Sequence, residues 1–102
     1  MSQGSITQRA DGELALAGVL DYSTGPALRE QGGCLIAASK AGALRLDCSA
    51  VERSSSVGLS LLLSFTRDAR KAGKTLQIVG MPNDMQEIAK VGGLLEILPL
   101  QH

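Results

Sequence analysis

The chain has 102 residues, and its ten basic and ten acidic residues leave no formal net charge. This length suits one domain, and a hydrophobic content of 44% excludes a disordered chain. The balanced charge and the presence of only two aromatic residues, Tyr22 and Phe65, disfavour nucleic-acid binding, which uses basic surfaces and aromatic stacking platforms. We therefore expect a single domain over residues 1–102.

The first third of the chain predicts a hairpin followed by a helix. Residues 5–9 and 13–20 have the pattern of two strands, and Asp11-Gly12 between them is a strong two-residue turn signal. After a loop over residues 21–24, Pro26 stands where a first helical turn tolerates proline, and we expect this helix to reach Lys40.

The remaining chain alternates between strands and helices. The helix before residue 43 contains Gly32-Gly33, which weakens that prediction because a glycine costs about 1 kcal/mol relative to alanine inside a helix. A second helix should stop at Ala72, because lysine and arginine lie in its last turns and Gly73 follows it. The expected elements are a strand over residues 43–48, a helix from Ser55 or Ser56 to Ala72, a strand over 75–80, a helix over 82–91 and a last helical turn before Pro99.

The element order ββαβαβαα predicts an α/β fold with a mostly parallel four-stranded sheet, to which the first strand adds as part of the N-terminal hairpin. The strands that end near Leu20, Cys48 and Gly80 should point the same way. The loops that follow them, over residues 21–24, 49–56 and 81–83, then lie along one edge, where open α/β sheets place their sites.

Residues that carry catalysis are scarce. The only histidine is His102, which disfavours a histidine-based triad or metal site, and the chain has neither a GxSxG motif nor a glycine-rich phosphate loop. Cys34 and Cys48 have the wrong spacing for a zinc site, so we expect two small, buried thiols in a reducing cytosol. Acidic residues of the edge loops fit a solvated surface better than a catalytic pair. We expect neither an enzyme nor a cofactor or metal.

The chain also carries no strong membrane signal. Its longest apolar run, near residues 59–65, is far shorter than the roughly 20 residues that span a bilayer, and residues 1–13 lack the apolar segment of a signal peptide. We expect a cytoplasmic protein that reaches a membrane only through a partner.

The serine run Ser54-Ser55-Ser56 opens the second helix, where one serine would act as the N-cap. At 100° per residue, Gly58, Leu61, Leu62, Phe65, Ala69 and Ala72 share a core face. A second face mixes hydroxyls, leucines and arginine, and we call it the helix strip: Ser56, Leu59, Ser60, Leu63 and Arg67. Two interpretations stay open, a protein-docking surface with exposed leucines or leucines covered by a neighbouring helix.

Two neighbouring loops add candidate residues to the helix strip. Tyr22 is a loop tyrosine, a residue type that is enriched at interface hot spots, although a partly buried tyrosine fits equally well. Met81 fits better as packing at the sheet edge. The candidate partner-binding residues are Ser55, Ser56, Leu59, Ser60, Leu63, Arg67, Tyr22 and Met81.

The stretch "LRLDCSAVERSSSVGLSLLLSFTRDARKAGKTLQIVGMP" resembles the signature of STAS domains, the family named from sulfate transporters and anti-sigma factor antagonists. The upstream "GVLDYSTGPAL" resembles the family's second motif, so the resemblance covers nearly the whole chain. The matching positions are Asp47, Ser49, Val51, Ser56, Gly58 and Leu59 in the first motif, and Gly18, Leu20, Asp21, Thr24, Pro26 and Leu28 in the second.

The resemblance divides at the serine run. Anti-sigma factor antagonists usually carry Asp-Ser-Ser-Gly here, and a partner kinase phosphorylates the second serine. In this chain Ser55 replaces the aspartate and Val57, which has no hydroxyl, stands at the phosphoacceptor position. The chain is more similar to the branch formed by MlaB, the STAS subunit of the Mla phospholipid-transport ABC complex, with Ser56 at the hydroxyl position.

This similarity implies a non-enzymatic subunit that binds the ATPase of an Mla-type ABC transporter at the cytoplasmic face of the inner membrane. It would support the assembly or activity of that ATPase in maintaining outer-membrane lipid asymmetry. One alternative is an anti-sigma factor antagonist that docks an anti-sigma kinase, with Ser56 as a substitute phosphoacceptor. Small-ligand binding at the loop edge also stays open.

Overall fold

The computed structural model describes residues 3–99 and contains one four-stranded sheet with the order β1-β2-β3-β4. Strand β1 (Ser5–Ala10) pairs antiparallel with β2 (Glu13–Leu20). Strands β3 (Ala43–Ser54) and β4 (Thr75–Val79) then add in parallel. The predicted hairpin, the mostly parallel sheet and the element order are confirmed.

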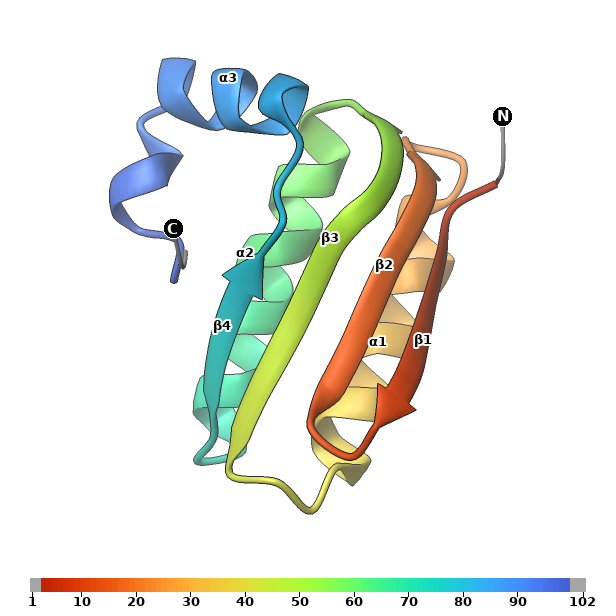
Figure 1. The fold of residues 1–102 in the computed structure, drawn as a ribbon, viewed down its shortest axis with the longest axis vertical. Helices are drawn as coiled ribbons and strands as arrows, with labels where there is room; N and C mark the ends of the chain where they lie inside the picture. Colours follow the sequence, from red (N-terminus) through yellow and green to blue (C-terminus); the bar gives the residue numbers. More distant parts are fainter. Residues whose placement is uncertain (1–2, 100–102) are drawn as a thin grey trace.

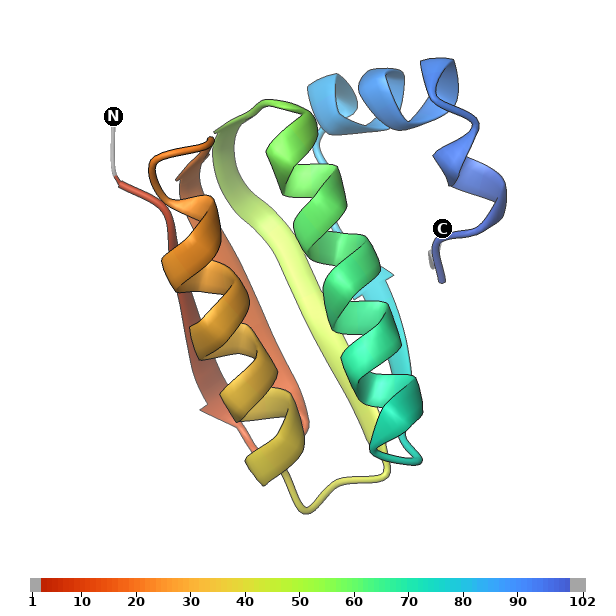
Figure 2. The same cartoon turned by 180° about the vertical axis from the view of Figure 1, so that it is seen from behind.

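Two helices cover one face of this sheet. Helices α1 (Gly25–Ala38) and α2 (Ser56–Lys71) connect neighbouring parallel strands, and both lie behind the sheet in Figure 1 and in front of it in Figure 2. Right-handed connections in a sheet of sequential order place successive helices on the same face. Helix α3 (Asn83–Val91) crosses near the carboxyl end of β4, and the short η1 helix (Leu94–Glu96) follows it.

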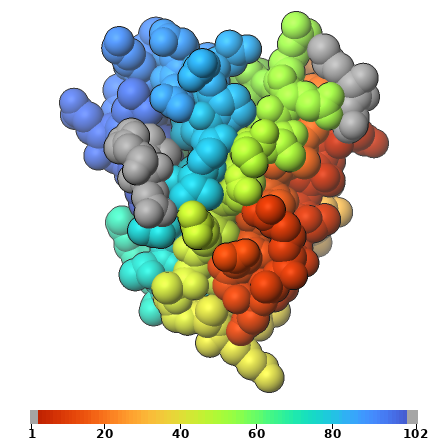
Figure 3. Space-filling model, in the orientation of Figure 1, coloured from red at the N-terminus to blue at the C-terminus, as the bar shows by residue number. Residues whose placement is uncertain are grey.

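The other face of the sheet carries no helix among the described residues (Figure 1), and in the space-filling view of this side the colours of the strands reach the surface (Figure 3). Side chains on this face are small or polar, and Arg9 Nη2 of β1 reaches across β2 to Asp47 Oδ2 of β3 at 2.7 Å. Ala15 lies between the two in the strand register, opposite Thr7 on one side and Asp47 on the other. Its small side chain leaves the arginine room to cross.

Strand β3 continues to Ser54, so the prediction that residues 49–54 form a loop is wrong. The extension pairs with β2 through two register shifts, at residues 15–17 and 18–19 of β2. Val51 is buried in this extension, opposite Gly18. The local sequence hides the strand because the register shifts interrupt the alternation of buried and exposed residues.

Helix α1 ends at Ala38, two residues before the predicted end. Asp11 Oδ1 of the hairpin turn accepts hydrogen bonds from Ser39 Oγ at 2.8 Å and from the Lys40 amide at 3.2 Å. Ser39 has extended backbone angles, so this contact holds the chain where it leaves the helix.

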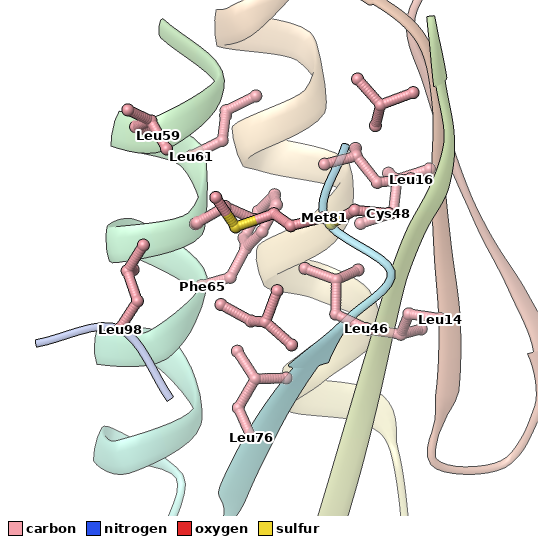
Figure 4. Packing of buried hydrophobic residues seen from close by; sticks show 14 of the residues in the cluster. Leu14, Leu16, Leu46, Cys48, Leu59, Leu61, Phe65, Leu76, Met81 and Leu98 are labelled. Carbon is pink, nitrogen blue, oxygen red and sulfur yellow. The ribbon is translucent and has the colours of Figure 1, made fainter. Parts of the chain in front are cut away.

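The core fills the space between the sheet and the two helices (Figure 4). Phe65 of α2 is fully buried and lies directly under Gly32 of α1. A Cβ atom added at Gly32 would lie within 2.5 Å of Phe65 Cζ, whereas the nearest atom to a Cβ at Gly33 would be an Asp68 carboxylate oxygen at 3.2 Å. Gly32 therefore permits a close approach of the two helices that outweighs its low helix propensity.

Lys74 ties the end of α2 to the end of α1. Its Nζ donates to the carbonyls of Ile36 and Ser39 at 2.6 Å and of Ala37 at 3.3 Å. These carbonyls belong to the last turn of α1, where a cation is favourable.

We expect Lys74→Met to lower the free energy of unfolding by about 1–2 kcal/mol, because it leaves these carbonyls without a charged donor. Urea denaturation monitored by circular dichroism measures this loss. Lys71→Met, at an exposed position of α2, is the control and should change the value by less than about 0.5 kcal/mol. Equal effects of the two substitutions would contradict the capping role.

Candidate protein-docking surface

The loop after β2 is held by Asp21, which leaves Tyr22 pointing outward. Asp21 Oδ1 accepts hydrogen bonds from the Ser23 amide at 2.9 Å, from Ser23 Oγ at 2.6 Å and from the Thr24 amide at 3.3 Å. The bonds from Ser23, side chain first, lower the pKa of this carboxyl. Tyr22 is 84% exposed, so the interpretation of a partly buried tyrosine is wrong.

The three serines at the start of α2 have three different environments. Ser54 is buried, and its hydroxyl donates to the Ser55 carbonyl at 2.8 Å. Ser55 is the N-cap, since its Oγ accepts from the Val57 amide at 3.2 Å, and its own amide donates to the Leu20 carbonyl at 3.0 Å. Ser56 is the first helical residue and is exposed. The predicted N-cap is therefore Ser55.

Only some residues of the helix strip are exposed to solvent. Ser56, Ser60 and Arg67 are exposed, and Leu63 is half-buried against the core. Leu59 is 3% exposed and lies among core side chains in Figure 4, so of the two open interpretations the exposed docking leucine is wrong for Leu59. Leu59 is buried because the core face of α2 is broader than the predicted stripe.

Met81 is also buried, at 8% exposure, and packs in the core as its position at the sheet edge suggested (Figure 4). Gly80 before it has a φ of +68°, and a Cβ there would lie 2.8 Å from Asp47 Oδ1. A glycine is thus needed to turn the chain from β4 into this packing position.

The structure brings two predicted residues, Tyr22 and Ser60, to one groove between the amino-terminal halves of α1 and α2. The groove has a volume of about 430 Å³. Four side chains outside the candidate partner-binding residues also line it: Pro26 and Arg29 from α1, and Val57 and Ser64 from α2. These side chains meet only because α1 packs beside α2, and no local motif predicts that packing.

Asp47 lies within β3, on the sheet face that carries neither α1 nor α2, and two donors hold its carboxylate. The Ser49 amide donates to its Oδ1 at 2.8 Å, and Arg9 pairs with its other oxygen. The amide bond first and then the arginine lower the pKa of Asp47 from 3.8 to about 2.

A carboxyl with a lowered pKa in the folded state stabilises the fold above its unfolded pKa of 3.8, and this contribution is lost as the pH falls through about 2. We expect the free energy of unfolding to fall across this window and to fall less steeply in Asp47→Asn. Urea titrations between these pH values measure the slope. Glu87→Gln, which also replaces a carboxylate by its amide but at an exposed position, is the control. A wild-type slope in Asp47→Asn would contradict this role.

The described residues offer little for chemistry beyond binding. Residues 3–99 contain no group of three or more histidine, cysteine or acidic side chains placed to hold a metal ion. No helix in this part of the chain is long and apolar enough to cross a bilayer. Cys48 is buried, which raises the pKa of its thiol to about 12, whereas Cys34 is exposed, contrary to the expectation of two buried thiols. His102 lies outside the described residues.

Comparisons with known proteins agree with this architecture. A family model described as "Mlab, STAS domain" matches residues 6–99. No curated protein matches the chain by sequence.

Several solved structures share the fold. An anti-sigma factor antagonist from Mycobacterium paratuberculosis is 28% identical, with a TM-score of 0.76 over 96% of this chain and 83% of that one. A putative anti-sigma factor antagonist from Thermotoga maritima is 13% identical, with a TM-score of 0.74 over 95% and 84% of the two chains. The phosphorylated cell fate determinant SpoIIAA from Bacillus is 14% identical, with a TM-score of 0.67 over 97% and 89%.

Proposed function

This chain belongs to the STAS domain family, whose members are generally non-catalytic protein-interaction modules, and we propose that it is a docking subunit of an Mla-type phospholipid-transport ABC complex. It binds the ATPase of that complex at the cytoplasmic face of the inner membrane and supports its assembly or activity. The exposed part of the helix strip, Ser56, Ser60 and Arg67, together with Tyr22, forms the contact surface.

The observation that carries this proposal is the environment of Val57. This residue occupies the position at which anti-sigma factor antagonists carry the phosphorylated serine, and it has no hydroxyl to accept a phosphate. Its side chain is half-buried against the start of α1, where a Cβ at Gly25 would lie 2.8 Å from Val57 Cγ1. An apolar residue that packs the two helices together suits a constitutive subunit better than a phosphate switch. The family description of the matching model supports the same branch.

A docking subunit acts by equilibrium binding. It can favour an active arrangement of the ATPase only by the difference between its affinities for the active and inactive states. The direct test is whether the chain and the ATPase of the Mla-type transporter from the same organism form a stable complex after co-expression. A complex is the expected result, and separate elution of the two proteins in size-exclusion chromatography would contradict the proposal.

The alternative is an anti-sigma factor antagonist that docks a kinase, and the 28% identical structure from Mycobacterium paratuberculosis favours it. Ser56 is exposed and directly precedes the valine in the chain, and a phosphate there would add about −1.5 to −2 charges at the start of α2. Incubation with anti-sigma kinases and ATP, followed by intact-mass measurement, separates the two functions. We expect an unmodified chain, and a single phosphate on Ser56 would establish the alternative.

A further inference from the structure

We propose that the groove between α1 and α2 binds a partner segment in which a large apolar side chain lies next to a carboxylate, and that Arg29 recognises the carboxylate. This inference rests on the proposed docking function and names the chemistry of the partner at one place on the surface. The segment is part of a protein, because the groove holds about 430 Å³, enough for one large side chain but not for an extended lipid.

The floor and walls of the groove fit an apolar side chain. Leu61 is buried beneath it, Val57 is half-buried, and Pro26 forms the wall on the side of α1. Tyr22 lies at the rim and is the only exposed aromatic side chain among residues 3–99. An exposed tyrosine beside an apolar hollow has the composition of an interface hot spot.

The charge of the groove indicates which group of the partner lies beside the apolar side chain. Arg29 is the only charged residue that lines the groove among residues 3–99, and no acidic residue lines it. Helices α1 and α2 carry an excess of positive charge even though the chain as a whole is neutral: the basic side chains are Arg29, Arg67, Arg70 and Lys71, and the acidic ones are Glu30 and Asp68. An anionic group that enters the groove therefore meets a favourable potential.

Arg29 also has hydrogen-bonding capacity to spare. Within the described chain its guanidinium pairs with Asp68 alone, through a 3.4 Å bond from Nη1 to Oδ2, which is longer than a charge-assisted bond of ordinary strength. A guanidinium has several donors in a planar fork that matches a carboxylate, so Arg29 can pair with an incoming carboxylate while it keeps Asp68. Its side chain is 54% exposed and is within reach of such a partner.

The experiment titrates the isotope-labelled chain with 3-phenylpropionate, which carries an aromatic ring and a carboxylate, and with its neutral amide as the matched probe. Methyl NMR shifts of Val57 and Leu61 report on the groove. We expect both probes to shift these signals and the acid to bind up to about fivefold more tightly, the range that an exposed ion pair provides. Arg29→Gln should remove the difference, whereas Arg45→Gln on the opposite sheet face should keep it.

Equal affinities of the acid and the amide for the wild-type chain, or shifts that map outside the groove, would overturn the inference. A failure of this inference can be distinguished from a failure of the docking function. If the acid is preferred but the ATPase is not captured, the groove chemistry stands and the proposed partner is wrong. If the ATPase is captured and Arg29→Gln leaves both its capture and the probe affinities unchanged, the function stands and this role of Arg29 is wrong.

Discussion

Gly32→Ala should lower the free energy of unfolding by about 2 kcal/mol, although alanine is the better helix former. The added methyl group would overlap the ring of Phe65, with Cζ at 2.5 Å, and would lie 3.1 Å from Ile6 Cδ1. Both neighbours are buried, so the ring cannot move aside freely. Overpacking of this kind costs about 1–3 kcal/mol, more than the gain in helix propensity of up to about 1 kcal/mol.

Gly33→Ala is the matched control, one residue further along the same helix. The atom nearest to its new methyl group is a carboxylate oxygen of Asp68 at 3.2 Å, at the end of a side chain that can rotate. This variant should be neutral or more stable by up to about 1 kcal/mol. Urea denaturation of both variants measures the contrast. If Gly32→Ala were as stable as Gly33→Ala, the close approach of α1 and α2 at Phe65 would not be a constraint on the sequence.

The glycine pair illustrates what local sequence does and does not reveal. The hairpin turn, β2, the helix starts and the parallel order follow from turn residues, alternation and capping, which act within a few residues of each other. The effect of Gly32 on the free energy of unfolding depends on Phe65, 33 positions away in the chain. Helix propensity alone therefore predicts the wrong sign for this effect. The length of β3 was missed for a similar reason, because its last residues are held by irregular pairing with β2.

The part of the candidate surface that lies on one face of α2 could be predicted from the sequence. The positions of Ser56, Ser60 and Arg67 on one side of α2 follow from helical geometry. The burial of Leu59 does not, because it depends on which core side chains of other elements pack against α2. Arg29 and Val57 belong to the groove only because α1 packs beside α2, a relation between segments that no short motif encodes.

Ser56→Arg should weaken the complex with the ATPase by about 30-fold or more, the effect of losing a contact at an interface hot spot. Ser56 is exposed at the first position of α2, so a long cation there would keep a partner surface away from Ser60 and the groove beside it. The loss of stability should stay below about 1 kcal/mol, the range for an unfavourable charge at a helix start.

Gln77→Arg provides the control for this substitution. Gln77 is exposed on β4 and alternates with the buried Leu76 and Ile78, which places it on the sheet face away from the core, and the substitution introduces the same arginine side chain. Circular dichroism of both variants at matched concentration establishes that they are folded before binding is measured.

The affinity of these proteins for the ATPase of the Mla-type transporter, measured by isothermal titration calorimetry, tests the central claim most directly. The docking account predicts binding by the wild-type chain and by Gln77→Arg with similar dissociation constants, and a dissociation constant about 30-fold higher or more for Ser56→Arg. Wild-type affinity in a folded Ser56→Arg variant would contradict it.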